Sequence, residues 1–274
     1  MKNFEYAGYS IPHKLVMLTG GGTDDWKEIS DYHEESYKKY TPIKPNHTVL
    51  EIGSGVGRDA IVFSKYLSSK GRYIGIDIIK PSIEWCQENI TPKHKNFTFH
   101  YYDIESQIHN AEGKITTRDI ILPAESNSVD RIVLNSVFTH MFEKDIIHYL
   151  KEFSRVLKDD GLVLASFFVI DDNALDAVRN GERKLGRHPL SFKFKKGRGC
   201  YINDEQYPEG AVAFTPKRIQ KILKKGNMVL EGKIHRGVWS GFAETANGQD
   251  ILILMKKSNK ETKEQSKTID FTNE

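Results

Sequence analysis

The sequence contains little cysteine: Cys86 and Cys200 stand far apart, and neither belongs to a CxxC pattern. A disulfide-based fold and a zinc knuckle are therefore not expected, and the reducing cytoplasm is the expected compartment. Long apolar runs are also missing, because the longest nearly apolar stretch, Leu162–Ile170, is about half of what a membrane helix needs. Since the N-terminus has no basic segment followed by an apolar one, we predict neither a secretory signal nor a membrane span.

Neither sign of charge dominates the chain. The 40 Lys and Arg residues against 37 Asp and Glu give a formal net charge of +3, which is too small to indicate nucleic-acid binding by itself. The charge is uneven, however, because seven Lys or Arg residues and no acid lie between Arg183 and Arg198. The ten histidines show neither HxxxH nor carboxylate–metal spacing, so no metal site is predicted.

What the sequence does contain, from Pro45 onward, is an alternation of short apolar segments with amphipathic ones. This pattern is typical of βαβ units and a mostly parallel sheet. We predict strands at Thr48–Ile52, Arg72–Asp77, Asn96–Tyr101, Val129–Leu134 and Leu162–Ile170, with helices at Arg58–Ser68, Ser82–Asn89 and Phe142–Leu157.

After the fifth strand the alternation breaks, so residues 171–213 are expected to form a lid insertion. A further helix is predicted between Thr215, an N-cap residue followed by proline, and Gly226. Two final strands, Met228–Trp239 and Asp250–Met255, are expected to pair in antiparallel fashion.

These elements predict an α/β fold: a Rossmann-like, doubly wound, seven-stranded sheet with six parallel strands and one antiparallel strand. Residues 1–43 are expected to form an N-terminal helical cap that includes a helix at Asp24–Tyr40. The α/β domain is assigned to residues 44–257, and residues 258–274 form a polar tail.

A glycine-rich turn in the segment 49–58, VLEIGSGVGR, joins the first strand to the first helix. Gly53 and Gly55 allow the backbone to turn sharply and to approach a ligand closely. The helix that follows directs unpaired N–H groups and a positive dipole toward that point. The turn therefore predicts a ligand-binding loop, with a purely structural turn as the alternative.

The spacing within this loop separates three kinds of cofactor site. A P-loop requires Gly-Lys-Ser/Thr, whereas Arg58 and Asp59 occupy that place. A dinucleotide site prefers G-x-G-x-x-G, but Gly57 comes one residue early. The remaining interpretation is a loop for S-adenosylmethionine (SAM), with which Glu51, two residues before the first glycine, agrees.

Two carboxylates follow on the neighbouring strands. Asp77 ends the second strand, about twenty positions after the loop, where a carboxylate accepts two hydrogen bonds from a ribose diol. The alternative is a helix-capping aspartate, although Ser82 is better placed for capping. Asp103 ends the third strand, where it can accept from an adenine amino group or serve in a turn.

Several blocks of the sequence resemble the class I SAM-dependent methyltransferase family over roughly residues 45–170. They are VLEIGSGVGRDAI (49–61), YIGIDI (73–78), YYDI (101–104), and SVDRIVLNSVFTHM followed by FSRVLKDDGLVLASF (128–167). The resemblance implies S-adenosyl-L-methionine as cofactor, glycines along its methionine part, Asp77 on the ribose, and Asp103 with Ile104 at the adenine. The candidate cofactor-binding residues are Glu51, Gly53, Ser54, Gly55, Gly57, Arg58, Asp77, Ile78, Asp103, Ile104, Asn135 and Ser136.

The end of the fourth strand bears on the acceptor, because the carboxyl ends of the strands face the ligand crevice. Base and glutamine N-methyltransferases typically have an (Asp/Asn)-Pro-Pro-aromatic motif there, whereas this chain has Asn135-Ser-Val-Phe138. Neither cysteine suits a carbon methyltransferase. His140 is the candidate general base, with local packing as the alternative role and His188 and His235 as rivals.

The segments SVFTHM and GVWSGFAETANGQDILIL (237–254) also resemble a bacterial subgroup linked to surface-glycan and other small-molecule gene sets. This implies O-methylation of a small hydroxyl acceptor, such as a sugar or an activated sugar. The basic segment 183–198 can contact an anionic acceptor or form a solvated flap. An RNA or protein methyltransferase and a SAM-binding, non-catalytic regulatory partner remain alternatives, although nucleic acid is not the expected partner.

Overall fold

The structure is a computed structural model that describes residues 2–179, 184–185, 188–241 and 248–257. The chain divides into two compact units, residues 1–123 with 129–134, and residues 124–128 with 135–274. Parts of the predicted basic segment (Arg183 and Arg187) and the whole polar tail, 258–274, lie outside the described residues. Within the described residues, no helix combines the length and the apolar character needed to cross a bilayer.

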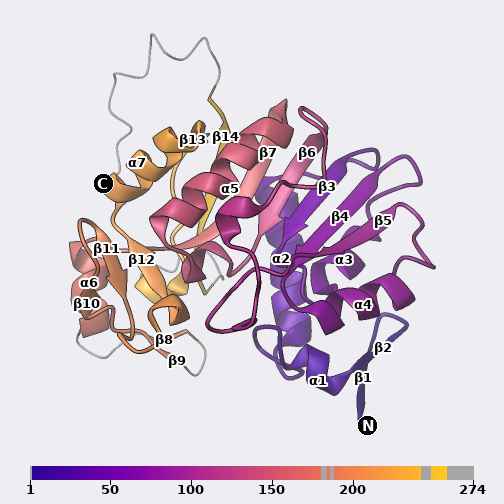
Figure 1. The fold of residues 1–274 in the computed structure, drawn as a ribbon, viewed down its shortest axis with the longest axis horizontal. Coiled ribbons are helices and arrows are strands. Elements are labelled where there is room, and N and C mark those ends of the chain that lie inside the picture. Colours follow the sequence, from indigo (N-terminus) through magenta and orange to yellow (C-terminus); the bar gives the residue numbers. More distant parts are fainter. Residues whose placement is uncertain (1, 180–183, 186–187, 242–247, 258–274) are drawn as a thin grey trace. The chain divides into compact units, whose positions relative to one another are not determined.

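The first unit contains a parallel sheet in the spatial order β6, β3, β4, β5 (Figure 1). Its connecting helices begin just after β3 and β4, so both crossovers start at the carboxyl edge of the sheet. The strand interiors are almost wholly apolar, as expected for a parallel sheet covered on both faces. The elements are β3 (Thr48–Ile52), α3 (Arg58–Phe63), β4 (Arg72–Asp77), α4 (Lys80–Asn89), β5 (Phe97–Tyr101) and β6 (Val129–Leu134), with a 3-10 turn, η1 (Thr117–Asp119).

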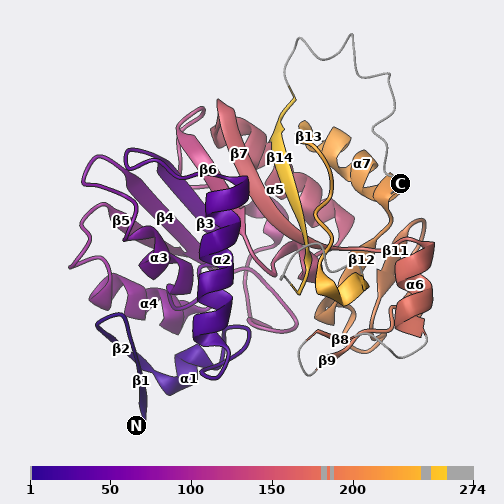
Figure 2. The same cartoon turned by 180° about the vertical axis from the view of Figure 1, so that it is seen from behind.

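The N-terminal segment of this unit carries a hairpin, β1 (Asn3–Tyr6) with β2 (Tyr9–Pro12), then α1 (His13–Val16) and α2 (Trp26–Tyr40). Figure 2 shows α2 running alongside α3. Trp26, His33 and Tyr37 of α2 are buried. The helix predicted from Asp24 is therefore present, with its first turn at Trp26.

The second unit is built around β7 (Leu157–Val169), which pairs antiparallel with β14 (Asp250–Lys256) and parallel with β12 (Val212–Phe214). β14 also pairs antiparallel with β13 (Met228–Leu230), which confirms the predicted antiparallel final pair. The helices α5 (Glu143–Val156) and α7 (Pro216–Lys225) pack against each other. α7 has the predicted ends, with Thr215 as a side-chain N-cap and Gly226 as C-cap.

Residues 171–213 contain more regular structure than the predicted lid. They form α6 (Asp172–Arg179), β8 (Lys184–Leu185), β9 (His188–Pro189), β10 (Phe194–Lys195), β11 (Cys200–Ile202) and β12, with η3 (Pro208–Gly210). β10 pairs with β11, and β11 with β12, so these strands extend the sheet from β7 and were missing from the seven-strand prediction. They are too short for a periodic pattern to mark them in the sequence.

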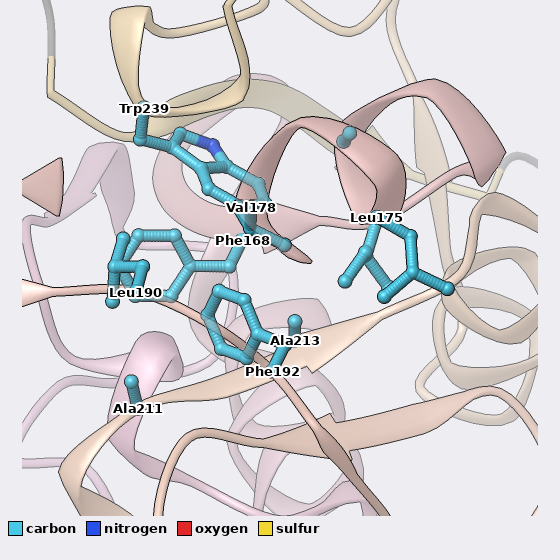
Figure 3. Close-up of a cluster of buried hydrophobic side chains, with 10 residues drawn as sticks. Phe168, Leu175, Val178, Leu190, Phe192, Ala211, Ala213 and Trp239 are labelled. Atoms are coloured by element: carbon cyan, nitrogen blue, oxygen red, sulfur yellow. The ribbon is translucent and has the colours of Figure 1, made fainter. Parts of the chain in front are cut away.

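A buried aromatic cluster fills the space between β7 and α6 (Figure 3). The ring centroids of Phe168 and Trp239 lie 5.0 Å apart, and those of Phe192 and Trp239 lie 5.5 Å apart. Leu175 of α6 and Ala213 of β12 complete the same cluster. Trp239 belongs to η4 (Val238–Ser240), so the cluster ties the segment before β14 to the carboxyl end of β7.

Several predicted boundaries were wrong for local reasons. The helix expected to reach Ser68 ends at Phe63, and beyond it the backbone N–H groups of Lys65 and Tyr66 bond to carbonyls three residues earlier. The strand expected over Met228–Trp239 stops at Leu230, since Gly232 has a φ of +71°. β7 begins at Leu157 rather than Leu162.

Candidate functional site

The glycine loop between β3 and α3 is folded against the end of β4. The backbone N–H groups of Gly53 and Ser54 both donate to the carbonyl of Ile76, at 2.8 and 3.0 Å. The three loop glycines have φ angles of +78°, +53° and +80°, a region that residues with a Cβ rarely occupy. The sharp turn predicted from the sequence is present, and its glycines are needed for backbone conformation.

Asp77 joins this loop to the start of α4. One carboxylate oxygen accepts the N–H of Gly55 at 2.6 Å, and the other accepts the N–H of Ile79 at 2.7 Å. Burial raises the pKa of Asp77, while these backbone donors act in the opposite direction. Asp77 therefore lies at the loop, as predicted, and also fixes the loop's shape.

Ser82 was expected to cap this helix, and that expectation was wrong. α4 begins at Lys80, its N-cap position is Ile79, and no side chain caps it. Ser82 thus lies inside the helix, where its hydroxyl has no hydrogen-bond partner among the described residues. The Asp77 bond to the N–H of Ile79 is what ties down the entry to the helix.

Two features of the loop test whether an adenosyl cofactor fits. The buried hydroxyl of Ser54 lacks a hydrogen-bond partner among the described residues, which costs free energy unless a ligand supplies one. A Cβ on Gly55 would lie 3.1 Å from Thr19, so the loop admits little bulk. A narrow turn with a buried, unpartnered hydroxyl beside a carboxylate suits the methionine and ribose parts of SAM.

Gly57 differs from the other two glycines. A Cβ there would lie 3.1 Å from the sulfur of Cys86, on α4, and 2.4 Å from Ile90, the C-cap of α4. Its missing side chain is therefore required for packing α3 against α4, as well as for its positive φ. The predicted contact of Gly57 with the cofactor's methionine part stays a prediction.

Glu51 and Arg58 have contacts that the sequence did not indicate. Glu51 is buried and accepts the hydroxyl of Tyr73, and burial together with the nearby Asp59 raises its pKa well above the usual range. Arg58 donates to the carbonyl of Gly20 at 2.9 Å, and its guanidinium lies 5.5 Å from the ring of Trp26. Glu51 thus supports the loop from the core, and Arg58 holds the N-terminal cap against the loop.

The predicted adenine residues lie at the ends of the neighbouring strands. Asp103 follows β5 and accepts hydrogen bonds from Tyr101 at 2.6 Å and from Asn110 at 3.1 Å, and these donors lower its pKa. Ile104 is buried, and Ile78 is partly exposed directly after β4. The loop, Asp77 and Asp103 therefore meet at one edge of the parallel sheet, as the sequence predicted.

Asn135 and Ser136, predicted as cofactor-binding residues, belong to the second unit. Ser136 has a φ of +55°, its N–H donates to the hydroxyl of Ser166 at 2.7 Å, and its own hydroxyl donates to Gln249 at 3.1 Å. Such a left-handed serine is a strained conformation of the kind that clusters at functional sites. Asn135, its neighbour, directly follows β6 in the chain.

His140, in η2 (Phe138–His140), forms a hydrogen bond with the segment before β12. Its Nδ1 lies 2.8 Å from the backbone carbonyl of Glu209. Because a carbonyl only accepts, Nδ1 carries the proton, and the lone pair of the neutral ring is on Nε2. A general base that acts through Nε2 would use this tautomer. His235 is held through its backbone to Ile251, and the side chain of the other rival, His188, lies outside the described part.

The sequence did not indicate several residues that support the site through hydrogen bonds. Tyr73 donates to Glu51, the carbonyl of Gly20 accepts from Arg58, and Ser166 and Gln249 both accept from Ser136. All are distant in sequence from the residues they hold, so no local pattern marks them. Within the described residues, no group of three or more His, Cys, Asp or Glu side chains is arranged to hold a metal ion.

The fold defines a class of protein, a Rossmann-like domain with a glycine loop at the carboxyl edge of its parallel sheet. Residues 43–227 match the family model described as "Methyltransferase domain", which is more than half of the chain. The chain belongs to this family, and it is a class I SAM-dependent methyltransferase with S-adenosyl-L-methionine as its cofactor.

Individual relatives are distant. An arsenite methyltransferase from Rattus norvegicus is 26% identical over 214 residues, covering 75% of this chain and 54% of that protein. The uncharacterized methyltransferase YcgJ from Bacillus subtilis is 28% identical over 149 residues, covering 54% of this chain and 51% of that protein. The chain thus spans about half the length of the curated relatives it matches.

Among solved structures, the PH0226 protein from Pyrococcus horikoshii is similar with a TM-score of 0.56 and 15% sequence identity. The similarity covers 85% of this chain and 92% of that one. It confirms the α/β methyltransferase fold of the chain.

Proposed function

We propose that this chain transfers the methyl group of SAM to a hydroxyl of a small acceptor, a saccharide or an activated saccharide. The cofactor part of this proposal is supported by the glycine loop, in which the N–H of Gly55 donates to the carboxylate of Asp77. A ribose diol would add its hydroxyls to the Asp77 carboxylate, and the Ser54 hydroxyl would gain a partner.

When bound, SAM supplies a methyl group that is already activated on a sulfonium sulfur, so alignment alone can contribute up to ~7–11 kcal/mol. A neutral hydroxyl acceptor must also lose a proton. His140 suits that step, because the bond from Nδ1 to Glu209 places the basic lone pair on Nε2. General-base assistance of this kind contributes roughly 10²–10⁴ in rate.

Arsenite is the acceptor suggested by the names of several relatives. A thiophilic metalloid is bound by thiolates rather than thiols. Both cysteines of this chain are buried, and burial raises the pKa of Cys86 well above its usual range and that of Cys200 to about 11. Neither cysteine is therefore an exposed thiolate ligand for arsenite, which supports an acceptor other than arsenite.

Mass spectrometry of the purified chain with labelled SAM tests this proposal. The acceptor panel contains neutral saccharides, nucleotide-sugars, arsenite and a ribosomal protein extract. Label on a saccharide hydroxyl is the expected result. Label only on arsenite or protein would contradict the acceptor class, and a chain that binds SAM without transferring label would match the non-catalytic alternative.

A further inference from the structure

A pocket of about 480 Å³ lies wholly within the second unit, at the carboxyl ends of β7 and β12. These two strands are parallel neighbours, with Val169 opposite Phe214. Residues 170–172, after β7, and 215–217, after β12, form its opposing walls. In open α/β sheets, ligands bind outside the carboxyl ends of neighbouring parallel strands. The volume is within the ~300–1,000 Å³ usual for small-molecule sites.

The apolar side of the pocket is rigid. Ile170 and Leu175 line it and also belong to the buried aromatic cluster shown in Figure 3. Tyr201 of β11 is partly buried against the same cluster and contributes an aromatic ring to the wall. Aromatic rings present a flat apolar face with a polar tip, which suits a ligand that is apolar on its faces and polar on its edges.

The polar side of the pocket is nearly balanced in charge. Asp171 accepts the N–H of Ala174 at 2.8 Å and pairs with the buried Arg236 at 3.2 Å. The guanidinium of Arg236 therefore compensates the negative charge of Asp171. The remaining charged lining residues are Asp172, in the first turn of α6, and Lys217, in the first turn of α7. With Asp171 paired and Lys217 set against Asp172, the lining offers no net positive charge to attract a strongly anionic ligand.

We propose that this pocket is a binding subsite for a neutral saccharide. The C–H face of the sugar ring packs on Tyr201, and its hydroxyls bond to Asp172 and to the amide of Gln220. That the bound sugar is also the methyl acceptor rests on the proposed function.

Saturation-transfer NMR on the full chain tests the subsite without any cofactor. The probes are the methyl glycosides of glucose, galactose, mannose and rhamnose, each compared with glucose 1-phosphate. We expect transfer to the ring protons of at least one neutral glycoside. Tyr201→Leu, which keeps apolar bulk, should weaken binding roughly fivefold or more, since an aromatic contact is lost. Tyr201→Phe, which keeps the ring, should bind within about twofold of the original chain.

The matched control is Tyr207→Leu, because Tyr207 lies on the same segment but is 63% exposed and does not line the pocket. It should leave binding unchanged. Gln220→Ala on α7 is a second variant, whose folding we expect to be unaffected, and it should weaken binding several-fold. Equal binding by Tyr201→Leu and the original chain would overturn the proposal. So would glucose 1-phosphate binding that depends on Lys217 while no neutral glycoside binds.

Calorimetry with S-adenosylhomocysteine (SAH) separates this inference from the proposed function. Asp77→Ala should weaken SAH binding while leaving glycoside binding unchanged, because the pocket is formed by the second unit alone. If the original chain bound SAH but no neutral glycoside, the subsite would fail and the methyltransferase proposal would stand. The reverse result would remove the methyltransferase proposal and leave the subsite.

Discussion

The carboxylate of Asp77 is held by two backbone donors, Gly55 and Ile79, one on each oxygen. A carboxylate oriented in this way keeps lone pairs in fixed directions for additional donors. This single side chain fixes the shape of the loop, and we propose that it also binds the ribose, so a substitution there should affect both.

Asp77→Ala should weaken SAH binding by ~1.5–3 kcal/mol, the size of hydrogen bonds lost to a charged group. Isothermal titration calorimetry measures the change. Asp160→Ala, at an exposed aspartate of β7, is the control and should bind like the original chain. An unchanged affinity for Asp77→Ala would remove the ribose assignment.

His140→Ala should lower kcat by at least ~10²-fold while the affinity for SAH survives, because the base acts on the acceptor and not on the cofactor. Turnover with labelled SAM measures the rate. His235→Ala is the comparison, since His235 is the rival base whose environment is described. If only the His235 variant lost activity, the role of base would pass to that residue.

At the scale of elements, α2 is fastened to α3 by a buried polar contact. Nδ1 of His33 lies 2.9 Å from both oxygens of Asp59, and the hydroxyl of Tyr37 donates to the same carboxylate at 2.5 Å. These partners, with Arg58, outweigh the effect of burial and lower the pKa of Asp59 to about 2. Because α3 begins at the glycine loop, the cap helix is connected to the loop through Asp59.

Asp59→Asn should lower the free energy of unfolding by about 2 kcal/mol at pH 7. The folded-state pKa of Asp59 is below the unfolded value near 3.8, so this stabilisation is present above pH 4 and is lost as the pH falls toward 2. Urea denaturation from pH 7 to pH 2 measures it. The stability difference between the original chain and the variant should therefore narrow in acid.

The control for this experiment is Asp31→Asn. Asp31 pairs with Lys27 on the exposed side of α2, where both side chains are largely solvated. Such pairs contribute ~0–1 kcal/mol, so this variant should remain close to the original chain at every pH. A similar loss in both variants would show that the buried contact of Asp59 has no special role.

At the scale of the whole molecule, cofactor binding should appear as thermal stabilisation. SAH at one hundred times its dissociation constant raises the free energy of unfolding by ~2.7 kcal/mol. For a chain of this size, that raises Tm by roughly 5–10 °C. Differential scanning fluorimetry measures the shift. Asp77→Ala should reduce it at equal SAH concentration, and NADH should produce none. A shift with NADH but not with SAH would contradict the cofactor assignment.

The sequence predicted the parts of the molecule that depend on local pattern. β3, β4 and β6 have their predicted bounds, and α7 has its predicted caps, because hydrophobic periodicity and capping residues act over a few positions. The glycine loop was recognisable for the same reason. Its three positive φ angles favour glycine, and the three glycines lie close together in the sequence, where a local pattern reveals them.

Only the tertiary structure decided the roles of residues whose partners are far away in the chain. Arg58 meets Gly20, Glu51 meets Tyr73, and Ser136 meets Gln249. β12 joins β7 across the forty-odd residues that the sequence treated as a lid. Such contacts form when separate elements pack together, and burial then sets charge and geometry at each site. Neither effect leaves a pattern among neighbouring residues, so packing and not sequence spacing determined them.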